Sequence, residues 1–351
     1  MAVSRKNQLN PQKASFLKDA FLSSPLHALF RSAKTPVYAI GVSGGADSAM
    51  LLVYAAHIAS LYNIKIHAVH VHHGLQAIAD EWVRHTRQLA QMLGVECSIE
   101  YVQVASTSGL GIEASARNAR YRAYEDFAER TGIRHFLLAH HLYDQTETVL
   151  LRLLRGAGVQ GMAAMAGHSQ RGELHFYRPW LDVSRQNILE AEKQFFLETG
   201  WQAVHDPTNA DSRYTRAAVR EMLVPVLDER WHGWRGNLAR HSRLMAENTL
   251  LLKDLAQIDY ATLDASADNT RFSLQKWREL PMHRQANVLR YWLDLQHIPM
   301  PSEARLNEWM RQFRQLHQLG HDRNLKLKHA RHEINVIKGW VSIRCVAENE
   351  T

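Results

Sequence analysis

Short apolar runs alternate with longer amphipathic segments along roughly the first 200 residues of the chain. The runs predict strands at residues 37–42, 64–71, 97–104, 135–139 and 175–181. Apolar positions at helical spacing predict intervening helices at residues 48–61, 80–93, 112–131, 144–155 and 183–199. This alternation is typical of an α/β fold with a doubly wound, mostly parallel sheet, in which the ligand lies beyond the carboxyl ends of the strands.

The alternation stops in a polar stretch at residues 201–215. Beyond it the pattern predicts helices, followed by short strands within 325–345, the helices lying at residues 215–227, 237–260, 282–296 and 303–319. One amphipathic helix is expected near residues 16–30. We therefore expect three parts, namely an N-terminal extension (1–35), an α/β domain (36–215) and a smaller, mainly helical domain (216–351).

Composition indicates the class of protein and the compartment in which it is expected. Hydrophobic residues make up 46% of the 351 residues and charged residues 22%, as in a folded globular protein. No apolar run reaches the ~18 residues of a membrane helix, and the polar, basic residues 1–18 lack the apolar core of a secretory signal. The two cysteines, Cys97 and Cys345, form neither a disulfide framework nor a Cys-x-x-Cys motif. A cytoplasmic protein without a membrane partner is expected.

Positive charge is concentrated in the second part of the chain. The formal net charge is +7, and residues 216–351 hold 21 Lys and Arg against 16 Asp and Glu, a net of +5. A basic C-terminal region favours a polyanionic partner such as nucleic acid.

A glycine-containing loop joins the first predicted strand to the helix that follows it. Adjacent glycines let a backbone approach a phosphate closely, and the helix N-terminus adds free N–H groups and a positive dipole end. The carboxylate in the loop would repel phosphates unless it holds Mg²⁺. The loop therefore predicts a site for ATP with Mg²⁺, formed by Ser43, Gly44, Gly45, Ala46, Asp47 and Ser48.

This loop resembles that of the ATP-pyrophosphatase, or PP-loop, superfamily. Five further stretches narrow the resemblance to the tRNA(Ile)-lysidine synthetase family: HVHHGL (70–75, with Asp80), EASARNARY (113–121), AHHLYDQTET (139–148, continuing through 152–165), RPWL (178–181) and DPTN (206–209). The resemblance implies a C–N ligase: ATP adenylates C2–O of cytidine 34 in the CAU anticodon of tRNA(Ile), and the ε-amine of L-lysine displaces AMP. The lysidine so formed would change decoding from AUG to AUA.

The chain departs from the family pattern at two positions. Tyr143 precedes Asp144 where the family has two aspartates, and Ala217 replaces an asparagine between Arg216 and Arg220. Longer relatives carry an extra C-terminal domain, and we expect this chain to end at the first substrate-binding domain.

Three carboxylates are the candidate catalytic residues. Asp47 and Asp144 are expected to bind Mg²⁺, while Asp144 and Glu147, three apart on one helix face, would hold Mg²⁺ or receive and deprotonate the lysine ammonium. The alternative for Asp144 and Glu147 is an acidic helix start that the dipole favours.

Five arginines are candidates for tRNA contact: Arg117, Arg120, Arg213, Arg216 and Arg220. The alternatives are ion pairs of the first two with Glu113 or Glu125, and a solvated helix face for the other three. The histidines at 70, 72, 73, 140 and 141 suggest hydrogen bonding at strand ends, and no zinc site is expected. Most tryptophans among Trp201, Trp231, Trp234 and Trp277 are expected in the core, although stacking on anticodon bases is the alternative.

Other functions remain as alternatives. A tRNA-thiolating PP-loop enzyme generally needs catalytic cysteines, which Cys97 and Cys345 do not match. An amidating synthetase would need a glutaminase segment. A non-catalytic tRNA-binding relative would fit the changes at Tyr143 and Ala217 but not the intact loop. The sequence leaves open whether the chain is a monomer or a homodimer.

Overall fold

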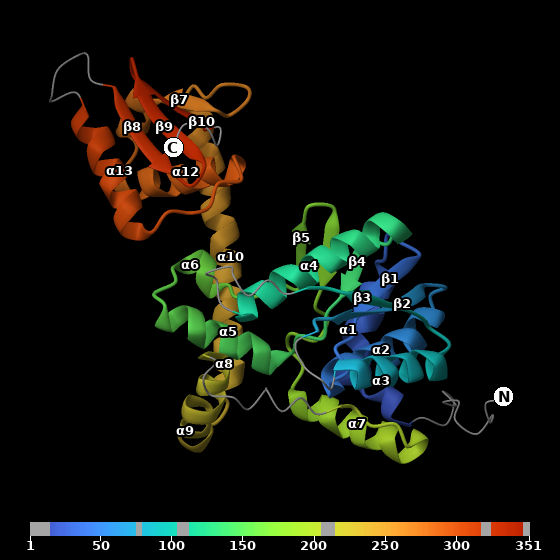
Figure 1. Cartoon of the computed structure of the whole chain (residues 1–351). Helices are drawn as coiled ribbons and strands as arrows, with labels where there is room; N and C mark the ends of the chain where they lie inside the picture. The colour runs from blue at the N-terminus through green and yellow to red at the C-terminus, as the bar shows by residue number, and fades with distance from the viewer. Residues whose placement is uncertain (1–14, 75–78, 104–111, 205–214, 317–323, 347–351) are drawn as a thin grey trace. The chain divides into compact units, whose positions relative to one another are not determined.

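The computed structural model describes residues 15–74, 79–103, 112–204, 215–316 and 324–346 (Figure 1). The chain forms two compact units, Met1–Leu244 and Met245–Thr351. The boundary between them falls inside one long helix, α10 (Trp234–Ala261). Within the described residues, no helix combines the length and apolar character needed to cross a membrane.

A six-stranded sheet forms the centre of the first unit. Its strand order is β3-β2-β1-β4-β6-β5, and every pairing is parallel except that of β5 with β6. The strands are β1 (Val37–Gly41), β2 (Lys65–His72), β3 (Glu96–Tyr101), β4 (His135–Leu137), β5 (His168–Arg171) and β6 (Leu174–Tyr177). The prediction of a mostly parallel sheet is confirmed, and β5 is an antiparallel edge strand that the apolar pattern did not indicate.

Helices cover both faces of this sheet. Tyr38 and Ile40 of β1 belong to a core that also contains residues of four of these helices, Leu89 and Ala90 of α3 (Ala79–Leu93) among them. Ala39, which lies between them on β1, packs with aromatic residues of α4 (Ile112–Thr131) on the opposite face. The first face also carries α1 (Ala20–Arg31), α2 (Ala46–Ser60) and α7 (Arg185–Thr199). A short 3₁₀ helix (Ser15–Lys18) precedes α1, and α3 lies beside β2 and β3.

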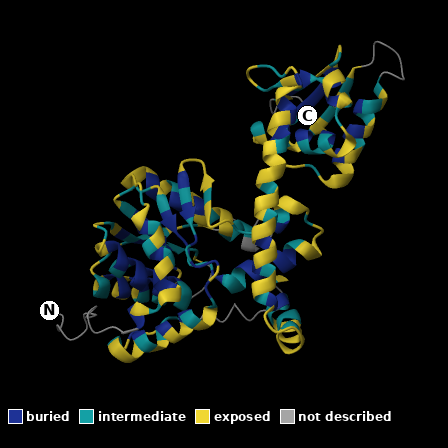
Figure 2. Cartoon of the chain, turned by 180° about the vertical axis from the view of Figure 1, so that it is seen from behind, coloured by how far each residue is buried: buried dark blue, intermediate teal, exposed yellow. Residues whose placement is uncertain are grey.

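Buried residues follow the strands and the sides of the helices that face them (Figure 2). Among the tryptophans considered from the sequence, Trp201, Trp234 and Trp277 are buried, whereas Trp231 is 56% exposed. The prediction that most of them pack in a core is therefore confirmed.

The helical segment expected at residues 215–227 is confirmed, but it is not one regular α-helix. It consists of α8 (Thr215–Ala218), a π-helical turn (Val219–Leu223) and α9 (Val224–Arg230). Pro225 stands in the first turn of α9. Because proline lacks the N–H that would bond four residues back, the regular bonding pattern is interrupted here. Two further helices, α5 (Leu142–Leu154) and α6 (Val159–Met162), complete this side of the unit.

The second unit combines helices with a four-stranded antiparallel sheet of order β7-β10-β9-β8. The strands are β7 (Arg271–Ser273), β8 (Leu325–His329), β9 (His332–Ile337) and β10 (Trp340–Cys345). The helices are α11 (Leu274–Glu279), α12 (Met282–Leu295) and α13 (Glu303–Gln315). Their apolar residues form one core with the inner face of the sheet. The strands expected within 325–345 are confirmed, and β7 is an addition.

Candidate functional site

Two serines of the loop between β1 and α2 form hydrogen bonds within the loop. The Ser48 hydroxyl receives a hydrogen bond from Ser43 N at 3.0 Å and donates to the Gly45 carbonyl at 3.1 Å. The two serine hydroxyls lie 3.1 Å apart. Gly45 is the N-cap of α2 and offers no side-chain acceptor to the first N–H groups of the helix. The first turn of α2 therefore keeps the free donors that bind anions at helix N-termini.

Gly44 gives this loop its shape. Its φ is +93°, in the region that residues with a Cβ rarely adopt, and its carbonyl accepts a hydrogen bond from Val204 N at 3.0 Å. Gly45 has an ordinary φ of −77°. Only the first of the two glycines is therefore required by backbone conformation.

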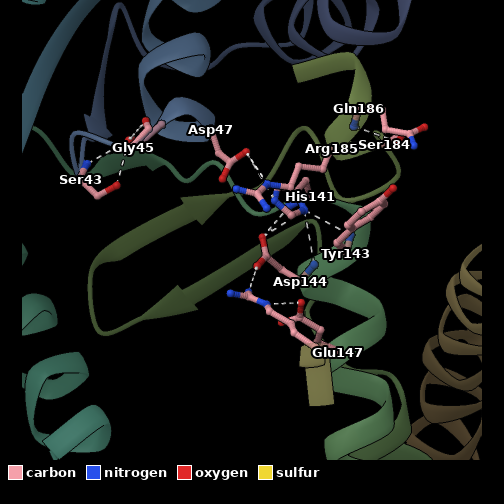
Figure 3. Close-up of polar contacts among 12 residues, drawn as sticks. Ser43, Gly45, Asp47, His141, Tyr143, Asp144, Glu147, Ser184, Arg185 and Gln186 are labelled. Carbon is pink, nitrogen blue, oxygen red and sulfur yellow. Dashed lines mark hydrogen bonds and ion pairs between the residues drawn. The ribbon is translucent and has the colours of Figure 1, made fainter. Parts of the chain in front are cut away.

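Asp47, in the first turn of α2, faces the side chains of a histidine and an arginine (Figure 3). Its Oδ1 lies 3.6 Å from His141 Nε2 and 3.6 Å from Arg185 Nε. These are ion-pair distances rather than hydrogen bonds, so this buried oxygen has no hydrogen-bond partner. Burial raises the pKa of Asp47, but the contact with His141 and the charges of His141 and Arg185 outweigh it and lower the pKa.

His141 connects Asp47 to Asp144. In the neutral imidazole, Nδ1 caps α5 by accepting from the backbone N–H groups of Tyr143 and Asp144, and Asp144 Oδ2 accepts from His141 N at 3.1 Å. This is a capping box with histidine in the usual place of serine or threonine. Burial lowers the pKa of His141, but contact with Asp47 and the charges of Asp144 and Asp47 raise it overall.

Glu147 lies one turn further along α5, and its side chain contacts Arg220 of the π-helical turn. Arg220 donates two hydrogen bonds to its carboxylate, at 2.5 and 2.9 Å, and lies 3.7 Å from Asp144 Oδ1. Glu147 is 5% exposed. Both of its oxygens are therefore bound within the protein, and Asp144 is the more accessible carboxylate of the pair.

A cleft of about 980 Å³ connects these residues. The loop Ser43–Ser48, both aspartates and Glu147 line it, together with the ends of β1 and β2. This is the carboxyl edge of the sheet, as expected for a doubly wound fold. Cationic residues on several elements also line it, namely Arg120, Arg185, Arg216, Arg220 and Arg235.

The candidate tRNA-contacting arginines fall into different environments. Arg120 and Arg216 line the cleft, whereas Arg117 is exposed on α4 and donates to the Tyr121 hydroxyl at 3.2 Å. Glu125, a proposed partner for Arg117 or Arg120, pairs instead with Arg171. Arg213 and the DPTN motif lie outside the described residues.

The remaining histidines make separate contacts. His70 Nδ1 lies 2.8 Å from the Val42 carbonyl, and His72 Nε2 lies 3.3 Å from Asp80 Oδ1. Burial, together with Arg120 and two other histidines, lowers the pKa of His73 to about 4. Burial also lowers the pKa of His140 to about 4, with Asp144 opposing the shift and Arg178 supporting it. Within the described residues, no group of three metal-ligating side chains converges.

Sequence reasoning missed the roles of His141 and Arg185. His141 belongs to a recognised motif but was assigned only a general hydrogen-bonding role, and the i, i+3 spacing of the capping box was the available signal. Arg185 begins α7, 138 residues from Asp47 along the chain. Its proximity to Asp47 could be known only from the tertiary structure.

The strand, Gly-Gly loop and helix at this edge of a parallel sheet define a PP-loop nucleotide-binding protein. A PP-loop domain model matches residues 19–227, and a model of the TilS substrate binding domain matches residues 272–345. The solved structure of a U34-tRNA thiolase from Methanococcus maripaludis has a TM-score of 0.54 at 15% identity, covering 68% of this chain and 85% of the other. That likeness concerns the fold alone.

Relatives identify the family within this class. The chain is 52% identical to a tRNA(Ile)-lysidine synthase from Bordetella pertussis over 305 residues, which cover 87% of this chain and 95% of the relative. It is 36% identical to a tRNA(Ile)-lysidine synthase from Polaromonas naphthalenivorans, with 86% and 88% coverage. The chain belongs to the tRNA(Ile)-lysidine synthase family.

Proposed function

We propose that this protein ligates L-lysine to C2 of cytidine 34 in the CAU anticodon of a tRNA(Ile), using ATP and releasing AMP and pyrophosphate. The observation that carries the proposal is a single cleft that holds the loop Ser43–Ser48, Asp47 and Asp144, in a chain 52% identical to lysidine synthases. The reaction would take place in the cytoplasm.

The first step would transfer AMP from ATP to the cytidine oxygen. The loop would bind the β- and γ-phosphates through the first N–H groups of α2 and the hydroxyls of Ser43 and Ser48. These donors would stabilise the charge that develops on the leaving pyrophosphate. Arg185, which lines the same cleft, would add a positive charge for the phosphates, since its contact with Asp47 is long, at 3.6 Å.

Mg²⁺ fits the carboxylates of this cleft. Asp47 Oδ1 is a buried acceptor without a hydrogen-bond partner, and Asp144 Oδ1 meets Arg220 only at 3.7 Å. Mg²⁺ is commonly held by one or two carboxylates and the phosphates of its substrate. Asp47 and Asp144 are the residues that would hold it, and it would offset phosphate charge.

The second step would need a deprotonated lysine ε-amine at the adenylated cytidine. Asp144 is the residue we assign to receive the ammonium and accept its proton. Glu147 would support this step indirectly, since it holds Arg220 beside Asp144.

The tRNA would contact the basic residues outside the loop. We assign Arg117, Arg120, Arg213 and Arg216 to phosphate contacts near the anticodon, and residues 216–351 to further tRNA binding. Arg220, expected from the sequence to join them, is held instead by Glu147. Charge neutralisation at phosphates gives affinity without sequence preference. Whether a homodimer is the active form would be measured by sedimentation with and without tRNA.

The test is incorporation of labelled lysine into an unmodified tRNA(Ile) transcript with a CAU anticodon, in the presence of ATP and Mg²⁺. Asp47→Ala should abolish labelling. Asp126→Ala, at an exposed position on α4, is the matched control and should retain it. ATP consumption and tRNA binding without lysine incorporation by the unaltered protein would refute lysidine formation.

A further inference from the structure

Arg235, in the first turn of α10, is held in one orientation by three neighbouring side chains. Its guanidinium carbon lies 4.2 Å from the centre of the Tyr143 ring and 4.5 Å from the centre of the Trp234 ring. Asp228 accepts hydrogen bonds from both terminal nitrogens of Arg235, the one from Nη2 at 3.0 Å. Trp234 Nε1 donates to the same carboxylate at 2.8 Å. The guanidinium is therefore fixed against the Tyr143 ring.

The ion pair with Asp228 also offsets the charge of Arg235. The hydrogen bond from Arg235 is the main cause that lowers the pKa of Asp228, so the carboxylate stays ionised. Only 18% of the Arg235 side chain is exposed. Because both terminal nitrogens already have an anionic partner, Arg235 is poorly suited to bind a phosphate or a free carboxylate. What this part of the cleft offers instead is the flat, uncharged surface of an aromatic ring.

Tyr143 provides that surface. It is the second residue of α5, is partly buried and lines the cleft, as does Asp144 beside it. Its ring centre lies 5.9 Å from that of His141 at an interplanar angle of 89°, an edge contact at the start of α5 (Figure 3). Arg235 and His141 thus support the ring, which still lines the cleft. Since the family pattern has an aspartate at this position, the ring is a feature of this chain.

The proposed reaction brings a nucleobase to the same place. The oxygen that receives AMP belongs to a cytosine, and Asp144 is the residue assigned to the attacking amine. The cytosine must therefore be unpaired and lie beside Asp144. Unpaired bases in RNA are commonly held by stacking on aromatic side chains, and Tyr143 directly precedes Asp144 in the chain.

We propose that the Tyr143 ring stacks on the cytosine base that receives AMP. This assignment rests on the proposed function for the identity of the RNA and of its reacting base. Stacking selects a base that has left its pair and holds it flat, but it discriminates little among bases, because every base has a π-face. The same ring would also suit the adenine of ATP, and the experiment separates the two sources.

The test uses an anticodon stem-loop RNA with a CAU loop, in which pyrrolocytidine, a fluorescent analogue quenched by stacking, replaces the reacting cytidine. The full chain is compared with Tyr143→Leu, which removes the ring, and Tyr143→Phe, which keeps it. Trp231→Leu is the matched control, because Trp231 is a 56% exposed aromatic residue that is not among those lining the cleft. Thermal melting checks that each variant folds, and calorimetry measures ATP binding without RNA.

We expect the unaltered protein, Tyr143→Phe and Trp231→Leu to quench the probe equally. Tyr143→Leu should bind the RNA about tenfold more weakly, and the probe should stay bright when the variant is saturated with RNA. ATP affinity should be the same in all four proteins. Full quenching by Tyr143→Leu, or no quenching by the unaltered protein, would overturn the proposal.

Two further outcomes separate this contact from neighbouring ideas. A loss of ATP affinity in Tyr143→Leu, with quenching retained, would assign the ring to adenine and overturn the contact with cytosine. If the unaltered protein fails to incorporate lysine into tRNA(Ile) but the quenching still depends on the ring, the proposed reaction is refuted and the base contact stands.

Discussion

Arg220 and Glu147 form a two-point ion pair that joins the π-helical turn to helix α5, with Nε–Oε1 at 2.5 Å and Nη2–Oε2 at 2.9 Å. The two residues are 73 positions apart in the chain. Side-chain contact with Glu147 is the main cause that raises the pKa of Arg220, with burial opposing it. The pair therefore fixes a positive charge beside Asp144 in a geometry that a lysine could not reproduce.

Arg220→Ala should destabilise the fold by about 2 kcal/mol, because the buried Glu147 carboxylate would lose its partner. The value lies below that of a fully buried pair because the Arg220 side chain is 36% exposed and partly screened by water. Urea unfolding measures the change. The double variant Arg220→Met/Glu147→Gln is the control and should recover most of the loss, since it leaves no unpaired charge. If the double variant is as unstable as the single one, the ion pair is not the cause.

Gly44→Ala should cost about 1–3 kcal/mol of folding free energy because an alanine at φ +93° is strained. Gly45→Ala is the matched control. Its φ is −77°, and an added Cβ would meet only Ser43 Oγ, at 3.7 Å, so its cost should stay below about 1 kcal/mol. Thermal or urea unfolding of both variants compares them directly. Equal destabilisation would mean that the loop does not hold the conformation described for Gly44.

Much of the first unit could be predicted because its apolar periodicity is strong. β1 and α2 are almost continuously apolar, and they came within about two residues of their expected ends. β5 was missed because its sequence, His-Ser-Gln-Arg, has no apolar residue, as an exposed edge strand permits. The π-helical turn was missed because the spacing of apolar residues is typical of an α-helix on both sides of it. Pro225 was the only local indication in this segment that the regular helix is interrupted.

The candidate site was predictable to the extent that topology determines it. Asp47 follows β1 and Asp144 follows β4, and the carboxyl ends of neighbouring parallel strands meet at one edge. The pairing of Arg220 with Glu147, and of Arg185 with Asp47, depends on where distant helices pack. The residue spacing within one helix or strand does not show which distant helices pack together. For this reason Arg220, expected from the sequence to contact tRNA, is held instead by the Glu147 carboxylate.

Tyr143, where the family pattern has an aspartate, should couple energetically to Arg235. The Arg235 guanidinium carbon lies 4.2 Å from the centre of the Tyr143 ring. We expect a coupling of about 0.5–2 kcal/mol in a double-mutant cycle of Tyr143→Ala with Arg235→Ala. Tyr143→Phe keeps the ring and is the control that should change stability little. A coupling near zero would show that the contact with the ring contributes nothing to stability.

Two histidines that line the same cleft as the loop Ser43–Ser48 should titrate on opposite sides of the ordinary pKa of about 6.5. The pKa of His141 is raised, because contact with Asp47 and the charge of Asp144 outweigh its burial. That of His73 is lowered to about 4 by burial and by Arg120, His70 and His72. NMR titration of the imidazole signals would measure both. Between about pH 6 and 5, His141 should be protonated while His73 stays neutral.

The sign of each contribution to stability follows from these directions. Protonated His141 stabilises the fold fully below about pH 6.5, and this stabilisation is lost as the pH rises through its raised pKa. His73 makes the opposite contribution. Stability is lost as the pH falls from about 6.5 towards 4, because in this range His73 is protonated in the unfolded chain but still neutral in the folded chain.

Asp47→Asn should lower the pKa of His141, because the variant removes the contact with the Asp47 carboxylate while His141 stays buried. The pKa of His73 should not change in this variant. A His141 pKa that does not fall in this variant would contradict the ion pair, whereas equal shifts at both histidines would indicate a general change in structure.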